Sequence, residues 1–261
     1  MPLDPMVAGA ISVFFLLGAI VSSFIGVLVA RMHTGQSFLT GRSHCDACNA
    51  TLAPLTLVPI LSFVASGGRA TCCGTRLSTL SPLTEILLGS LFVLSYLTVG
   101  YTLVLLGMLI ALSLLLALVL YDLTHQILPP TLLYLFIAVS AVTSFIGASS
   151  YASFLQTALV AFLIALSLLA IHIFSRGRAM GFADAPFVFG LALLVGSAAL
   201  PGFVFSFWIG AVVGIVLLLK RPHGSRMGVE VPFAPFLAAG FLLAYFTQWN
   251  PFVLTVTLLN H

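Results

Sequence analysis

The chain has 261 residues, of which 61% are hydrophobic and only 6% are charged, and its formal net charge is +3. An ordinary soluble domain is about half apolar and about a quarter charged, and a disordered segment is far less apolar, so both classes are excluded. The apolar runs are long and unbroken, which predicts helices in a lipid bilayer. The basic residues are spread over several loops, so no compact patch indicates a nucleic-acid partner.

Eight apolar segments have a length suited to membrane spans, which take about 20 residues each. In chain order we expect them at residues 6–30, 82–99, 102–121, 130–147, 154–174, 186–200, 203–219 and 231–246. The first has no basic residue before it and is longer than the apolar core of a signal peptide, which indicates a retained helix. The sequence therefore predicts an all-α polytopic bundle of about eight transmembrane helices.

A polar insert separates the first two expected spans. We divide the chain into a first membrane helix at 1–30, a small insert with a cysteine cluster at 31–81 and a membrane core at 82–261. All nine Lys and Arg residues lie in the insert and in two later loops, which eight spans place on one side of the membrane. Because Lys and Arg are enriched in cytoplasmic loops, we expect the insert in the cytoplasm and both termini on the opposite side.

Two aspartates stand out, because a carboxylate beside the hydrocarbon layer is costly and marks a functional site. Asp122 follows the third expected span and Asp184 precedes the sixth, so both fall at the cytoplasmic face. If the two carboxylates approach, they share one proton, and one acts as a base on water while the other polarises a carbonyl group. Gly181 would let a substrate backbone come close to Asp184, because glycine has no side chain.

Other interpretations of these acids stay open. Each aspartate could cap a helix or pair with an arginine. The two could also form the proton relay of a transporter, although a transporter more often places polar groups near the middle of the bilayer in repeated, broken helices. A third alternative is an inactive assembly factor on the same scaffold. A cleavage assay separates these alternatives.

All four cysteines lie in the insert, at Cys45, Cys48, Cys72 and Cys73. A cytoplasmic location disfavours stable disulfides, and the spacing of the first two is that of half a tetrahedral zinc site. Because Cys72 and Cys73 are adjacent, we expect strain if both bind one ion, with His44 or a water as a further ligand. A structural zinc and a set of free thiols are the two alternatives.

Taken together, these segments resemble the type IV prepilin peptidases, the GxGD-type aspartic proteases of the bacterial inner membrane. The first catalytic motif is matched by the segment that starts at Asp122, and the second by the segment that ends at Asp184. The segments that carry the resemblance are, in chain order, Ser23-Phe24, Cys45–Gly74, Ser81–Glu85, Asp122–Pro129, Gly181–Asp184 and Val231–Phe236. Their order along the eight expected spans makes the set specific. Presenilin-like proteases share the aspartate pair, but their size and surrounding motifs fit less well.

The resemblance implies a membrane aspartic endopeptidase whose catalytic pair is Asp122 and Asp184. Its partners would be precursors of type IV pilins or type II secretion pseudopilins, whose basic leader is cut after a glycine at the cytoplasmic face of the inner membrane. It also implies methylation of the new N-terminus, with S-adenosylmethionine as the cofactor. Ala183 replaces the second glycine of the GxGD motif and adds a methyl group near the substrate strand.

Overall fold

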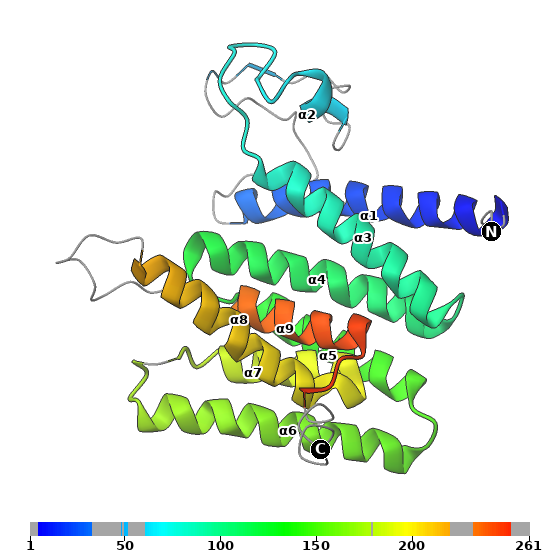
Figure 1. Ribbon diagram of the computed structural model, residues 1–261, viewed down its shortest axis with the longest axis vertical. Coiled ribbons are helices and arrows are strands. Elements are labelled where there is room, and N and C mark those ends of the chain that lie inside the picture. Colours follow the sequence, from blue (N-terminus) through cyan, green and yellow to red (C-terminus); the bar gives the residue numbers. More distant parts are fainter. Residues whose placement is uncertain are drawn as a thin grey trace, which may run out of the picture. The chain divides into compact units, whose positions relative to one another are not determined.

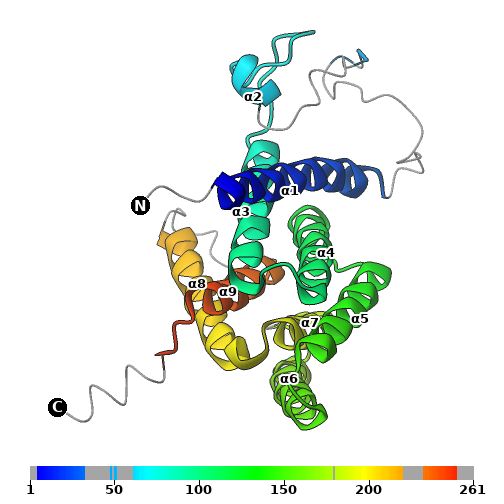
Figure 2. The same ribbon diagram turned by 90° about the vertical axis from the view of Figure 1, so that its right-hand side faces the viewer.

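The computed structural model describes residues 5–32, 48, 50, 51, 61–178, 180–219 and 232–251. These residues form helices, together with an isolated antiparallel bridge between Arg69 and Arg76 (Figures 1 and 2). The chain divides into two compact units, Met1–Tyr101 and Thr102–His261. The predicted all-α class is thereby confirmed.

The first unit is built on two apolar helices, α1 (Pro5–Arg31) and α3 (Leu80–Val99), which pack against each other. Gly18 and Gly89 lie where they cross, and a Cβ atom added to Gly18 would be only 2.7 Å from the Gly89 Cα atom. The two backbones are therefore in direct contact, as small residues allow between membrane helices. The short helix α2 (Leu61–Ala65) lies in the segment that joins them.

The second unit contains the remaining helices. They are α4 (Leu103–His125), α5 (Pro130–Gly147), α6 (Tyr151–Phe174), α7 (Asp184–Val195), the short 3-10 helix η2 (Gly196–Ala198), α8 (Ala199–Leu219) and α9 (Ala234–Thr247). Ten of the 12 residues of α7 are buried, because this helix packs against α5, α6 and α9. The helix that begins with Asp184 is thus at the centre of the unit.

Local sequence signals set several helix starts in this unit. The Thr102 hydroxyl oxygen accepts the Leu105 N–H at 3.3 Å, and the Ser150 hydroxyl oxygen accepts the Ser153 N–H at 3.2 Å. Both satisfy an N–H group that has no partner within the first turn of a helix. Pro130 occupies the first position of α5, where its missing N–H costs nothing.

The chain reverses direction between α7 and α8. Gly196 adopts a positive φ of 59° and ends α7. From there α8 runs back along α9. Two contacts show this path: the Ser206 hydroxyl donates to the Leu237 carbonyl at 3.2 Å, and the Phe207 ring centroid lies 5.5 Å from that of Phe233. Since Phe233 immediately precedes α9, the last turns of α8 lie at the same end of the unit as the start of α9.

By length and composition, six helical stretches in the described residues could cross a membrane. One of them, from Asp184 to Leu219, contains the reversal at Gly196 and consists of α7, η2 and α8. The helix α9 is apolar but shorter. The eight expected segments all appear as helices, but the sixth ends earlier than predicted, at Val195. With 12 residues, α7 is about 18 Å long, less than the roughly 30 Å of a hydrocarbon core, because the turn at Gly196 stops it.

Candidate active site

Asp122 lies in the last turn of α4, and its side chain is buried, with 7% of its surface exposed. The helix ends at His125, and the C-cap residue Gln126 adopts a left-handed conformation with φ 56° and donates its N–H to the Asp122 carbonyl at 2.8 Å. The Asp122 carboxylate accepts the backbone N–H of Ala234 at 3.3 Å. This hydrogen bond joins the end of α4 to the first residue of α9, 112 positions further along the chain.

Asp184 is the first residue of α7, and only 8% of its surface is exposed. Its carboxylate folds back over the preceding loop and accepts the Gly181 N–H at 3.0 Å. The N-cap position itself is Ala183, which makes no side-chain capping bond. Asp184 therefore differs from the simple helix cap considered from the sequence: its carboxylate is bonded to the loop, although it still lies at the positive end of the helix.

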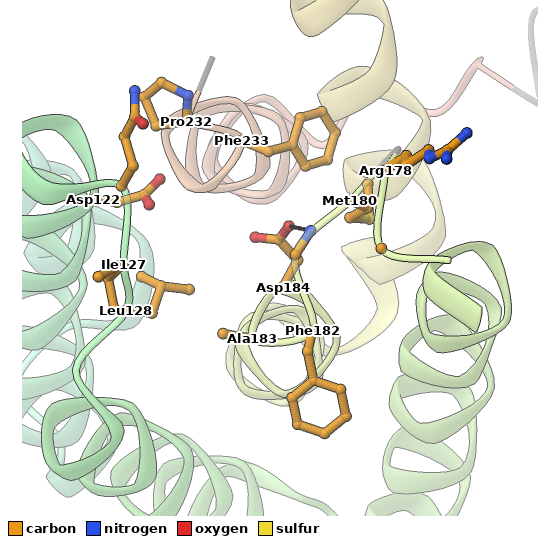
Figure 3. Close-up of a pocket in the computed structure, with 13 residues that line it drawn as sticks. Asp122, Ile127, Leu128, Arg178, Met180, Phe182, Ala183, Asp184, Pro232 and Phe233 are labelled. Atoms are coloured by element: carbon orange, nitrogen blue, oxygen red, sulfur yellow. Dashed lines mark hydrogen bonds between the residues drawn. The ribbon is translucent and has the colours of Figure 1, made fainter. Parts of the chain in front are cut away.

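The two aspartates line one cavity of about 480 Å³. Figure 3 shows their carboxylates pointing from opposite sides into the space between them, Asp122 from the end of α4 and Asp184 from the start of α7. The residues that line the cavity are Asp122, Gln126, Ile127, Leu128, Gly177, Arg178, Met180, Gly181, Phe182, Ala183, Asp184, Pro232 and Phe233. Three separate parts of the second unit thus converge on one space that holds two acids.

Gly181 and Ala183, the residues expected beside the substrate, both line this cavity. A Cβ atom added to Gly181 would lie 3.3 Å from the Asp184 Oδ2 atom, so the absence of a side chain there leaves room for the carboxylate. Ala183 has φ −69° and ψ −15°, a conformation open to every L-amino acid. Its methyl group therefore causes no backbone strain.

Two features of the site were not found from the sequence. One is the amide of Ala234, because a backbone N–H carries no side-chain signal; only the proline-rich segment around it was noted. The other is His172 in the last turn of α6, whose Nδ1 atom lies 2.8 Å from the Met180 carbonyl oxygen. The ring of His125, in the same turn of α4 as Asp122, packs on Tyr121 with a centroid distance of 4.5 Å.

The cysteines that the structure describes come together in the first unit. The Sγ atoms of Cys48, Cys72 and Cys73 all lie within 4.8 Å of one another, and the three side chains are exposed. Cys48 and Cys72 are separated by 3.3 Å, and Cys72 and Cys73 by 3.9 Å, measured between sulfurs. Cys45 and His44 lie outside the described residues.

These sulfur distances suit a tetrahedral metal site, in which Zn–S bonds of about 2.3 Å place the sulfurs about 3.8 Å apart. Adjacency along the chain therefore does not keep the Cys72 and Cys73 sulfurs apart. The reason is a tight turn between Ala70 and Thr75, in which Gly74 has φ 71°. The Gly74 N–H donates to the Ala70 carbonyl at 2.8 Å, and the Ala70 N–H donates to the Thr75 carbonyl at 2.8 Å. In this turn both sulfurs face the same side, so the group can hold a metal ion.

Comparison with protein families gives two matches that together cover most of the chain. Residues 16–99 match the bacterial peptidase A24 N-terminal domain, and residues 109–219 match the type IV leader peptidase family. The first match contains the described cysteines, and the second contains both aspartates.

Individual relatives support the same family. The chain is 32% identical over 238 residues to the prepilin leader peptidase/N-methyltransferase of Bacillus subtilis (strain 168), covering 90% of this chain and 93% of the relative. It is 35% identical over 209 residues to the protein of that name from Myxococcus xanthus (strain DK1622), covering 78% of this chain but 62% of the relative. The protein of that name from Dickeya chrysanthemi is 28% identical over 275 residues. No solved structure matches.

Proposed function

Because the chain belongs to the type IV leader peptidase family, we propose that it is a membrane aspartic endopeptidase whose catalytic pair is Asp122 and Asp184. The observation that carries this proposal is the cavity of about 480 Å³ into which both carboxylates point. The backbone amides of Ala234 and Gly181 each donate to one carboxylate, which fixes its orientation. Two oriented acids around one space are the arrangement that activates a water against a peptide bond.

The chemistry follows from a shared proton. Two carboxylates facing a small cavity do not both ionise readily, so one is ionised and the other keeps its proton. The ionised carboxylate takes a proton from water, whose oxygen attacks the carbonyl carbon of the scissile peptide. The protonated carboxyl group donates a hydrogen bond to the carbonyl oxygen. A proton then passes to the leaving nitrogen as the C–N bond breaks, which yields a new carboxylate and a new N-terminus.

The proposed substrates are precursors of type IV pilins or pseudopilins with a basic leader. The cavity combines its two acids with the apolar side chains of Met180, Phe182 and Phe233. The apolar surface takes up the hydrophobic residues of such a precursor, and the ionised acid attracts its positive charge, although Arg178 in the same lining offsets part of that attraction. Cleavage at the membrane surface would place both parts of this substrate within reach.

We also propose the bacterial inner membrane as the location, with the cavity at the cytoplasmic face and both termini on the opposite side. The support is the distribution of the nine Lys and Arg residues. The path of α8 agrees with it, because α8 returns along α9 to the end of the unit at which Asp122 contacts Ala234. The last turns of α8, which precede the basic residues 220–226 in the sequence, then lie at the same end as the aspartates.

The cysteine group is proposed to hold a structural zinc ion. Cys48, Cys72 and Cys73 offer three thiolates, and Cys45 completes the Cys-x-x-Cys spacing. A zinc ion held by such ligands stabilises a small segment that has little apolar core of its own. It is proposed as a structural element of the insert with no part in peptide cleavage.

Methylation is a separate proposal. The relatives named above carry N-methyltransferase in their names, and we propose the same activity here, with S-adenosylmethionine as the methyl donor. Transfer of a labelled methyl group to the cleaved product tests this activity.

The central experiment replaces each aspartate by asparagine and measures cleavage of a pilin precursor in membranes, with the protein level determined in parallel. We expect Asp122→Asn and Asp184→Asn each to lower the cleavage rate by at least about 10²-fold, since each removes an acid–base group of the pair. Asp4→Asn serves as the control, because the sequence puts this acid on the opposite side of the membrane, and it should cleave like the wild type. Full activity in either dyad variant would end the proposal.

The same assay decides between the alternatives. A transporter or an assembly factor would leave the precursor intact in the wild type as well. A peptidase would release a product of lower mass whose new N-terminus can be sequenced. The wild type must therefore produce this product before the aspartate variants are interpreted.

A further inference from the structure

The peptide group between Met180 and Gly181 is hydrogen-bonded at both ends. Its carbonyl oxygen lies 2.8 Å from the Nδ1 atom of His172, and its N–H group donates to the Asp184 carboxylate at 3.0 Å. A carbonyl oxygen can only accept, so Nδ1 of His172 carries the proton. One peptide group thus connects the last turn of α6 to the first residue of α7.

The planarity of the peptide bond makes this connection directional. The C=O and N–H groups of one peptide lie in one plane and point in opposite directions. When His172 fixes the direction of the Met180 carbonyl, it also fixes the direction of the Gly181 N–H. A rotation of this peptide would turn the N–H away from Asp184, and glycine at position 181 offers little steric resistance to such a rotation.

The local structure around His172 keeps its ring in place. The His172 carbonyl accepts the Gly177 N–H at 2.9 Å and the Ser175 hydroxyl at 3.2 Å, which closes the end of α6. Gly177 has φ 75°, so the chain turns back there toward the helix. The edge of the His172 ring meets the Phe182 ring with a centroid distance of 5.8 Å. The imidazole therefore lies under the loop that carries Gly181.

We propose that His172 is a positioning residue for Asp184, and that it acts through the peptide between Met180 and Gly181. It is not among the residues that line the cavity. Its ring donates from Nδ1 to the carbonyl and thereby strengthens the N–H donor at the other end of the same peptide group. The proposal rests on the proposed function, because it assigns a role in orienting one of its two acids.

The test compares two substitutions at the same position. His172→Leu removes the donor, whereas His172→Asn places an amide N–H close to where Nδ1 was. We expect the leucine variant to lower kcat by about 10-fold or more with KM for the precursor within about threefold, because substrate contacts are retained while Asp184 loses its orientation. The asparagine variant should recover most of this loss.

The control is Phe174→Leu, on the same helical turn, with 87% of its side chain exposed. It should leave kcat unchanged. A general weakening of the α6 end would impair the leucine and asparagine variants alike, so equal losses in both would overturn the proposal. A leucine variant within twofold of the wild-type kcat would overturn it as well.

A second measurement does not depend on cleavage. Hydrogen exchange followed by mass spectrometry reports on the amides of residues 176–184 in the intact protein. We expect faster exchange in this segment for His172→Leu than for the wild type, with His172→Asn close to the wild type, because the peptide between Met180 and Gly181 has lost one of its two hydrogen bonds. Unchanged exchange would contradict the positioning role, whereas failure of the wild type to cleave a precursor would contradict only the proposed function.

Discussion

The cysteine group and the aspartate cavity are both small polar sites, but they are assembled in different ways. Two of the three sulfurs come from adjacent residues, Cys72 and Cys73, and all three side chains are exposed. The two aspartates are buried and come from different helices, and the amide that holds Asp122 belongs to a third. A turn of a few residues creates most of the first site, whereas the second exists only when α4, α7 and α9 are packed.

This difference determines which kind of change should disturb the geometry of each site. An exposed ligand group has little apolar burial to hold it, so its geometry depends on the ion it binds. The aspartate cavity depends on close helix packing, which does not change when a metal is removed. Substitutions that affect packing should therefore disturb the cavity more than the cysteine group, and metal removal should do the opposite.

The largest effect is expected from Gly202→Leu in α8. A Cβ atom at this position would lie 2.8 Å from the Phe241 Cα atom in α9, and a backbone atom cannot move aside easily. Overpacking of this kind costs about 1–3 kcal/mol or more, and it should displace the start of α9 that holds Asp122. We expect loss of nearly all cleavage and a lower unfolding temperature in detergent, with the metal content retained.

The matched control is Gly214→Leu in the same helix, where nothing lies within 4 Å of an added Cβ atom. It should leave both cleavage and the unfolding temperature near the wild-type values. If the two leucine variants behave alike, the cavity does not depend on the contact between α8 and α9. If Gly202→Leu also releases the metal, the two sites are not as separate as their construction suggests.

An intermediate effect is expected from Gly181→Ala. The added methyl group would lie 3.3 Å from the Asp184 Oδ2 atom, so the carboxylate must shift by a few tenths of an ångström. We expect kcat to fall by about 10-fold, since small displacements of a catalytic group are costly. Ala183→Gly is the comparison, because the backbone there is already unstrained, and it should change kcat by less than about threefold. A larger loss in Ala183→Gly than in Gly181→Ala would contradict this account.

The smallest effect on cleavage is expected from Cys72→Ser, which removes the sulfur that lies 3.3 Å from Cys48 and 3.9 Å from Cys73. Bound zinc in the purified protein should fall from about one equivalent to less than about 0.2, because a hydroxyl is a poor substitute for a thiolate. Cleavage should stay within about threefold of the wild type, since the aspartates lie in the other unit. Thr71→Ser, next to the same group, should retain the metal.

Less than about half an equivalent of zinc in the wild type would argue for free thiols. A loss of cleavage as large as that of the aspartate variants would show that the insert takes part in catalysis. Either result would remove the distinction between a metal-dependent site and a packing-dependent one.

The helices could be predicted from the sequence because apolar length is a strong signal in a membrane protein. The aspartates were found for a related reason: a carboxylate is conspicuous in a chain with six acids. The early end of α7 was missed, because whether Gly196 continues or stops a helix depends on its φ angle. The contacts of Ala234 and His172 were also missed, since each involves a backbone group, the Ala234 N–H or the Met180 carbonyl, that gains its partner only after packing.

For the cysteine group, too, the sequence indicated the residues but not the backbone conformation that brings them together. The spacing of Cys45 and Cys48 indicated a metal site, but adjacent cysteines suggested strain. In an extended chain, the side chains of adjacent residues point to opposite sides. The hydrogen bond from Gly74 to Ala70 creates a turn instead, and only the backbone conformation reveals it.

The ordinary backbone conformation of Ala183 has a practical consequence. Because φ −69° and ψ −15° suit any side chain, this position can be varied without backbone strain. Its Cβ atom nevertheless borders the cavity, so each added carbon would take up space next to the acids. Position 183 is thus a suitable place to change substrate selectivity. A series of progressively larger residues there would reduce the cavity stepwise, and precursors with bulky amino acids at the cleavage site would be cleaved less well.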